Sequence, residues 1–165
     1  MLFSQDFDLH KIEIRDLHDV PEDGFWAVLT EDRADEPYLS ALCAKKGDRL
    51  AVREVWRELL PEASLLISSA ICGGDIRTRF EEAAHARSCY LLLEPMRMLF
   101  TLPCPDGCGE AIHTIPDGPR FYSDALFCNY THSPGRVILW DTEQTLEQKI
   151  CAAMEAGFRG IAIQA

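Results

Sequence analysis

Short apolar runs alternate along the chain with segments in which apolar residues recur every three or four positions. Continuous apolar runs occupy residues 25–29, 65–71, 90–93, 137–140 and 160–163. Such runs are typical of strands that are buried on both faces. Residues 11–15 alternate polar and apolar, which predicts a further, half-buried strand. The succession predicts an α/β fold with a largely parallel sheet built from βαβ units.

Helical periodicity fills most of the intervals between these runs. One helix is predicted before Gly47, which provides a left-handed stop. A second is predicted to start at Asp48 and to end at Pro61, because apolar residues follow the i, i+3, i+4, i+7 pattern at Val52, Val55, Trp56 and Leu59. A third follows Gly73, Gly74 and Asp75. Residues 121–130 fit a strand and a helix equally well.

The last thirty residues carry the clearest pattern. An apolar run ending at Trp140 is followed by Asp141 and Thr142, either of which can cap a helix, with Gln144 placed for a capping box. Apolar positions then recur at helical spacing until Gly157, and a final apolar run follows. We therefore predict two parallel strands, 136–140 and 160–163, joined by a right-handed βαβ crossover.

Size and composition indicate one ordinary globular domain, residues 1–165. No linker or repeat divides the chain, and 47% of its residues are hydrophobic. Residues 103–119 are rich in proline and glycine, which predicts a long loop.

The formal net charge of −11 argues against nucleic acid or an anionic membrane surface as a partner. No stretch is long and apolar enough to span a membrane, and no glycine-rich nucleotide motif is present, so we expect no cofactor. The first eleven residues lack the apolar segment of an export signal. The seven cysteines are therefore expected to be reduced thiols in a cytoplasmic protein.

Three acidic residues directly follow predicted buried strands: Glu31, Glu94 and Asp141. Ligands of parallel α/β sheets bind outside the carboxyl ends of the strands. Carboxylates that meet in such a cleft can act as acid and base, as glycoside hydrolysis requires. We take the three as candidate catalytic residues, with the alternative that Asp141 only caps the following helix.

Two further features at strand ends are candidates for substrate binding. Gly73 and Gly74 precede a predicted helix, where backbone N–H groups can face a ligand. Trp140 lies beside Asp141 and could provide a platform for stacking a sugar. Cys72 fits either a nucleophile near a helix N-terminus or a buried structural thiol.

A zinc site is an alternative interpretation of the residues in and after the long loop. Cys104, Cys108, Cys128 and His132, with His113 nearby, are soft ligands that could form a tetrahedral set. Their spacing differs from the usual CxxC pairs. A protein built around this site would be a zinc-stabilised interaction module.

The sequence resembles the C-terminal part of family 18 glycoside hydrolases, the chitinase-like TIM barrels that include spore peptidoglycan hydrolases. The resemblance lies in residues 137–149 and 157–163, which are similar to the last strand, acidic turn, helix and strand of that family. It also includes Asp23-Gly24-Phe25, similar to the start of the catalytic DGxDxDxE strand. It implies a partial or degenerate TIM barrel with a carbohydrate ligand.

The catalytic motif itself is not intact. Trp26, Val28 and Thr30 occupy the positions of its acids, and Glu31 is one residue out of register. We therefore expect a non-catalytic domain that binds a carbohydrate or a protein partner, the alternative being an active hydrolase using Glu31, Glu94 and Asp141. Because a partial barrel exposes a sheet edge, we also expect it to form a homodimer or to rearrange into a compact sheet.

Overall fold

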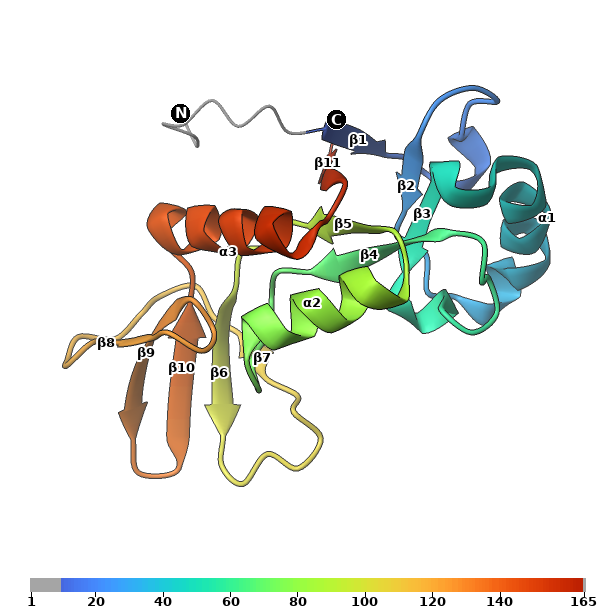
Figure 1. Ribbon diagram of the computed structural model, residues 1–165. Helices are drawn as coiled ribbons and strands as arrows, with labels where there is room; N and C mark the ends of the chain where they lie inside the picture. Colours follow the sequence, from blue (N-terminus) through green and yellow to red (C-terminus); the bar gives the residue numbers. More distant parts are fainter. Residues whose placement is uncertain (1–9, 165) are drawn as a thin grey trace.

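A closed barrel of six parallel strands forms the body of the protein (Figure 1). The computed structural model describes residues 10–164, so residues 1–9, considered above for an export signal, lie outside the described part. The barrel strands are β1 (His10–Ile14), β2 (Trp26–Val28), β3 (Leu50–Arg53), β4 (Ser64–Ser68), β5 (Cys89–Leu92) and β11 (Gly160–Gln164). Around the barrel they follow the order β1, β11, β5, β4, β3, β2.

Small and large side chains alternate around the barrel axis. Ala27, Ala51 and Ala162 lie inside together with larger residues, which are Ile12, Leu66, Tyr90 and Leu92. A six-stranded barrel is narrower than the eight-stranded type, so large residues at every inner position would not fit. The alternation of small and large residues therefore allows the barrel to close with a filled interior.

The barrel closes where the first strand meets the last. His10 pairs with Gly160 at the start of the β1–β11 contact, and any Cβ at position 160 would collide with the carbonyl oxygen of His10. Because β1 also pairs with β2, the barrel has no free edge. The expectation of an open partial barrel is wrong, and dimerisation, which rested on that edge, stays a prediction.

Three helices cover parts of the barrel. These are α1 (Glu36–Lys46), α2 (Ile76–Ala86) and α3 (Glu143–Ala156). Their apolar faces pack on the outer face of the strands in the largest hydrophobic cluster, around Trp56, Phe80 and Ile150. Short 3-10 turns connect other strands, at Leu17–Asp19, Arg33–Asp35, Gly47–Arg49 and Glu54–Trp56.

A second, antiparallel sheet is inserted between β5 and α3. Its strands are β6 (Arg97–Thr101), β7 (Glu110–Ala111), β8 (Phe121–Ser123), β9 (Cys128–Ser133) and β10 (Arg136–Trp140), in the order β7, β6, β10, β9, β8. Figure 1 shows it as a separate layer beside α3. Its own small core contains Met96, Phe100, Cys128 and Leu139.

The inserted sheet corrects the most definite prediction from the sequence. The run ending at Trp140 is antiparallel to β6 and β9 in this sheet, whereas the run around Ile161 belongs to the barrel. The two runs therefore do not form a βαβ unit. The helix between them is confirmed, with Thr142 as its cap and Gly157 at φ 98°, although the box partner of Thr142 is Thr145 instead of Gln144.

Two other segments also differ from, or settle, the sequence interpretation. The predicted helix from Asp48 to Pro61 is wrong, because Leu50–Arg53 forms barrel strand β3 and Glu54–Trp56 forms a 3-10 turn. Residues 121–130 contain two strands, β8 and the start of β9, joined by a turn. Within residues 10–164, no helix combines the length and apolar character needed to cross a bilayer.

Candidate functional site

Polar side chains gather at the carboxyl end of the barrel, where the inward-facing positions change character. On each strand every second residue points inward. In β3 the inward series passes from Ala51 to Arg53, and in β4 it passes from Leu66 to Ser68. Beyond β5 the same alternation leads from Leu92 to Glu94. The apolar interior therefore ends in a ring of polar groups at one mouth of the barrel.

Arg53 links two of the predicted acidic residues at this mouth. Its Nη2 donates to Oε1 of Glu94 at 2.8 Å, and its Nε lies 3.4 Å from Oε1 of Glu31. The Arg53 side chain is 25% exposed and that of Glu31 is 59% exposed, so the cluster reaches from the barrel wall to solvent. The structure thus brings Glu31 and Glu94 together through a residue that the sequence interpretation did not select.

Two serines of β4 and its following residue fix Glu94. The Ser68 hydroxyl donates to Oε2 of Glu94 at 2.6 Å. The Ser69 hydroxyl accepts from the backbone N–H of Glu94 at 2.8 Å and is 3.0 Å from its carbonyl oxygen. Both carboxylate oxygens of Glu94 are therefore hydrogen-bonded within the protein, which fixes the side chain in one orientation.

A cavity of about 460 Å³ opens beside this cluster. Its polar groups are those of Glu94 and Gln164, and its walls are apolar, formed by Ile14, Leu29, Leu92, Leu93, Pro95, Ala162 and Ile163. Apolar walls with a few fixed polar groups are typical of small-molecule sites. The barrel mouth therefore combines a cavity of suitable size with a charged, hydrogen-bonding rim.

Asp141, the third predicted acid, has a different role. Its side chain is fully buried in an ion pair with Lys149, with Nζ of Lys149 2.7 Å from Oδ1. Oδ2 also accepts from the backbone N–H of Met96 at 2.9 Å, and Thr145 donates to Oδ1 at 3.0 Å. Asp141 therefore fastens the start of β6 and the end of β10 to α3, and it is not exposed to a substrate.

The predicted substrate-binding residues do not join the barrel mouth as proposed. Trp140 is only 5% exposed, so it offers no open face to a sugar, and the guanidinium of Arg120 lies 5.7 Å from its ring centroid. Gly73 and Gly74 are exposed in the loop before α2, where Asp75 caps the helix by accepting from the backbone N–H of Thr78 at 3.0 Å. That cap already occupies the position in which a ligand anion would bind.

The four residues of the alternative zinc set remain separate. Among the described residues, no group of three or more His, Cys, Asp and Glu side chains is arranged to hold a metal ion. Burial raises the pKa of the Cys128 thiol to about 11. Partial desolvation and the nearby Asp106 carboxylate also raise the pKa of Cys104. Because zinc binds the thiolate, both shifts oppose coordination.

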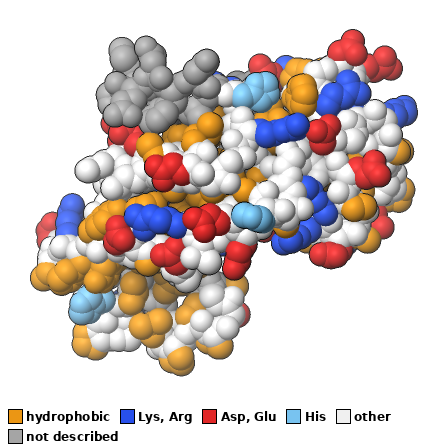
Figure 2. Space-filling model, in the orientation of Figure 1, with side chains coloured by type: hydrophobic (Ala, Val, Ile, Leu, Met, Phe, Trp, Pro, Cys, Tyr) orange, Lys and Arg blue, Asp and Glu red, His pale blue; other side chains and the backbone are white. Residues whose placement is uncertain are grey.

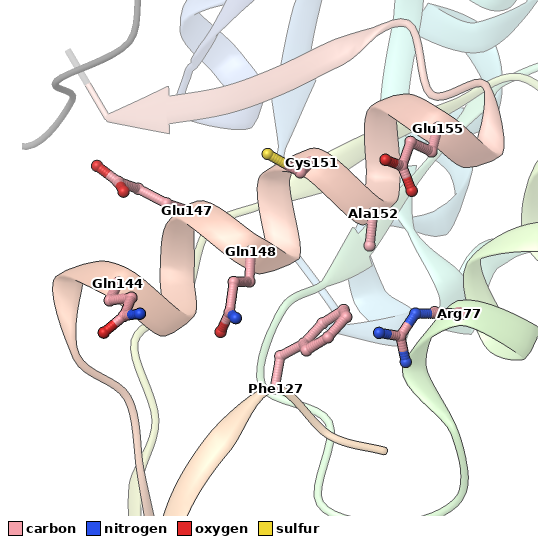
Figure 3. Close-up of a pocket in the computed structure, with 8 residues that line it drawn as sticks. All are labelled: Arg77, Phe127, Gln144, Glu147, Gln148, Cys151, Ala152 and Glu155. Atoms are coloured by element: carbon pink, nitrogen blue, oxygen red, sulfur yellow. The ribbon is translucent and has the colours of Figure 1, made fainter. Parts of the chain in front are cut away.

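A second hollow, along α3, is explained by packing between elements (Figure 3). Arg77 of α2 lies over the Phe127 ring at 4.2 Å and contacts Asp124 in the turn between β8 and β9. Phe127 adopts φ 45°, a left-handed conformation that this tight turn imposes. Figure 3 shows Glu147 and Cys151 pointing away from Phe127, so the lining groups do not converge on a ligand.

Comparison with known proteins adds no relative. No family model, curated protein or solved structure matches the chain. The functional argument therefore rests on the barrel mouth itself.

Proposed function

We propose that the protein is a non-catalytic, glycoside-hydrolase-like barrel that binds a carbohydrate at the carboxyl end of its strands. The observation that carries the proposal is Arg53, placed between Glu31 and Glu94 at the edge of the cavity. A degenerate TIM barrel with six strands is consistent with the closed parallel sheet, because TIM barrels bind their substrates at this end.

The chemistry of the mouth suits a polyhydroxylated ligand. Each sugar hydroxyl both donates and accepts, and the rim provides carboxylate acceptors, guanidinium donors and the Gln164 amide, which does both. The apolar face of a sugar ring can pack against walls such as Leu29 and Ile14. One site thus offers both kinds of contact that a saccharide needs.

The same geometry argues against hydrolysis. A glycosidase needs two carboxyl groups flanking the scissile bond, one of which donates a proton. Here both oxygens of Glu94 are hydrogen-bonded to Arg53 and Ser68, Glu31 contacts the same guanidinium, and Asp141 is buried elsewhere. No pair of free carboxyl groups therefore faces the cavity.

Binding can be tested by calorimetric titration with chitotetraose and with a soluble muropeptide. Wild-type protein should bind at least one of them, and Arg53→Met should weaken that affinity roughly tenfold or more, since hydrogen bonds to a charged group are lost. Gln164→Ala, which removes an exposed amide at the cavity, should weaken it less. Arg159→Met provides a matched control, because it breaks an exposed pair with Asp48 at the other end of the barrel.

The same samples decide between binding and turnover. If wild-type protein shortens either oligosaccharide and Glu31→Gln abolishes the activity, the hydrolase interpretation replaces this proposal. If wild-type protein binds neither compound, or if Arg159→Met weakens binding as much as Arg53→Met, the barrel mouth is not the carbohydrate site.

A further inference from the structure

A second cavity, of about 500 Å³, lies against one face of the inserted sheet, away from the barrel mouth. Strand register places Val137 opposite Phe100, and Leu139 opposite Tyr130, so these side chains share that face. The loop after β4 and the loop after β6 complete the walls with Cys72 and with Leu102, Cys104 and Gly107.

No charged side chain lines this cavity. Its lining is Cys72, Phe100, Leu102, Cys104, Gly107, Tyr122, Ser123, Leu126, Tyr130, Val137 and Leu139. In a chain with 27 acidic and 16 basic residues, an uncharged wall of this extent favours an uncharged ligand.

The polar groups of the lining are already bonded within the protein. The Tyr122 hydroxyl donates to Oε1 of Gln148 at 3.0 Å. The Ser123 hydroxyl accepts from the backbone N–H of Leu126 at 3.3 Å. A ligand that needs many hydrogen bonds would therefore lose its contacts with water without replacing them.

Aromatic rings give the cavity a preferred ligand shape. The Tyr130 ring in its wall continues into a group of nearly parallel rings, 5.3 Å from Phe121 and 6.3 Å from His132, with interplanar angles of 30° and 25°. Rings in this arrangement present faces on which another flat ring can stack with an offset. Figure 2 shows hydrophobic side chains gathered over the inserted sheet at the lower left.

The loop wall is fitted closely against the sheet. At Gly109 a Cβ would come within 2.8 Å of the Phe100 ring, so glycine allows the 104–109 loop to pack on that ring. Leu102, beside the opening, is 49% exposed and Tyr122 is 44% exposed. The cavity thus has fixed aromatic walls and an apolar entrance.

From these observations we infer that the inserted sheet binds a small, neutral, planar aromatic molecule in this cavity. The cavity volume is within the range of roughly 300–1,000 Å³ that small-molecule sites occupy. The site is independent of the carbohydrate proposal, because none of the barrel-mouth residues contributes to it.

A fluorescence titration with N-phenyl-1-naphthylamine, a neutral probe that brightens in apolar surroundings, tests the inference. Wild-type protein should enhance the probe saturably. Leu102→Arg places a charge at the entrance and should weaken binding roughly tenfold or more. Leu59→Arg is the matched control, because Leu59 is 44% exposed and lies outside the cavity lining.

A second pair of variants fills the cavity from within the sheet. Val137→Trp should block the probe, whereas Ile138→Trp, on the opposite face of the same strand, should not. Circular dichroism should show that each variant used is folded, and the Leu102 pair decides the matter if Val137→Trp unfolds.

Competition experiments define the ligand class. A neutral polycyclic aromatic should displace the probe, and 1-decanol should do so weakly. Displacement by 1-decanol at lower concentration than the aromatic would indicate a site for alkyl chains and would overturn the inference. So would an absence of saturable enhancement, or equal weakening by Leu102→Arg and Leu59→Arg.

Discussion

The barrel and the inserted sheet solve the problem of sheet edges differently. In the barrel every strand has two neighbours, so no backbone edge is left unpaired. The inner side chains meet around one axis, and alanines are needed where larger residues would collide. The inserted sheet ends at β7 and β8, and its cavity-bearing face is filled only in part. Residue size is therefore tightly restricted in the barrel and less so in the sheet.

The two regions are fastened to each other by one buried ion pair. Asp141 follows the last strand of the inserted sheet, and Lys149 belongs to α3, which packs on the barrel. Both side chains are fully buried. Removing one partner leaves an uncompensated charge, which is far more costly than losing an exposed pair.

The largest effect is accordingly expected from Asp141→Ala. It should lower the free energy of unfolding by about 3–5 kcal/mol, measured by urea denaturation and followed by tryptophan fluorescence. Asp48→Asn, which breaks the exposed pair with Arg159, should cost no more than about 1 kcal/mol. The double variant Asp141→Leu, Lys149→Met should recover most of the loss. A loss of similar size in Asp48→Asn and Asp141→Ala would show that burial does not set the cost.

A smaller effect should follow from adding volume to each region. Ala51→Leu places three extra carbon atoms in the filled barrel interior and should cost about 1–3 kcal/mol. Val137→Leu adds one carbon atom beside an existing cavity and should cost less than about 1 kcal/mol. Thermal or urea unfolding of both variants makes the comparison. Equal costs would contradict the difference in packing between the two regions.

Most of the barrel follows from local sequence patterns. The apolar runs at β2, β4 and β5 were predicted as buried strands, and Glu31 and Glu94 were expected at one end because parallel strands share their carboxyl ends. Arg53 was missed because Leu50–Arg53 had been interpreted as part of a helix. A short strand followed by a 3-10 turn can imitate helical spacing over so few residues.

Strand partners were harder to predict than strands. The run ending at Trp140 looks like a buried parallel strand, and nothing within it indicates that β6 and β9 are its neighbours. Pairing across such an insertion depends on contacts distant in sequence, to which local periodicity is blind. The buried role of Asp141 did leave a signal, because Lys149 lies on the apolar face of α3 between Leu146 and Ile150. A lysine in that position needs a buried partner.

The smallest effect compares one buried thiol from each region. Burial raises the pKa of Cys89 in the barrel, and of Cys128 in the inserted sheet, from 9.0 to about 11. The folded state thus retains these protons at a pH where the unfolded chain releases them. Stability is complete below pH 9 and falls as the pH rises from about 9 to about 11, since the unfolded state then binds fewer protons.

At pH 9.5 each thiol should reduce the free energy of unfolding by about 1 kcal/mol relative to pH 7. Urea denaturation at the two pH values should show this loss in wild-type protein, and Cys89→Ala and Cys128→Ala should each remove part of it. Cys72→Ser, which replaces an exposed thiol, is the control and should leave the loss in place. Equal contributions from Cys89 and Cys128 would mean that the inserted sheet, despite its free edges and its cavity, excludes water from its core as completely as the barrel layer does. A contribution from Cys89 alone would instead show that water reaches the core of the sheet through the cavity.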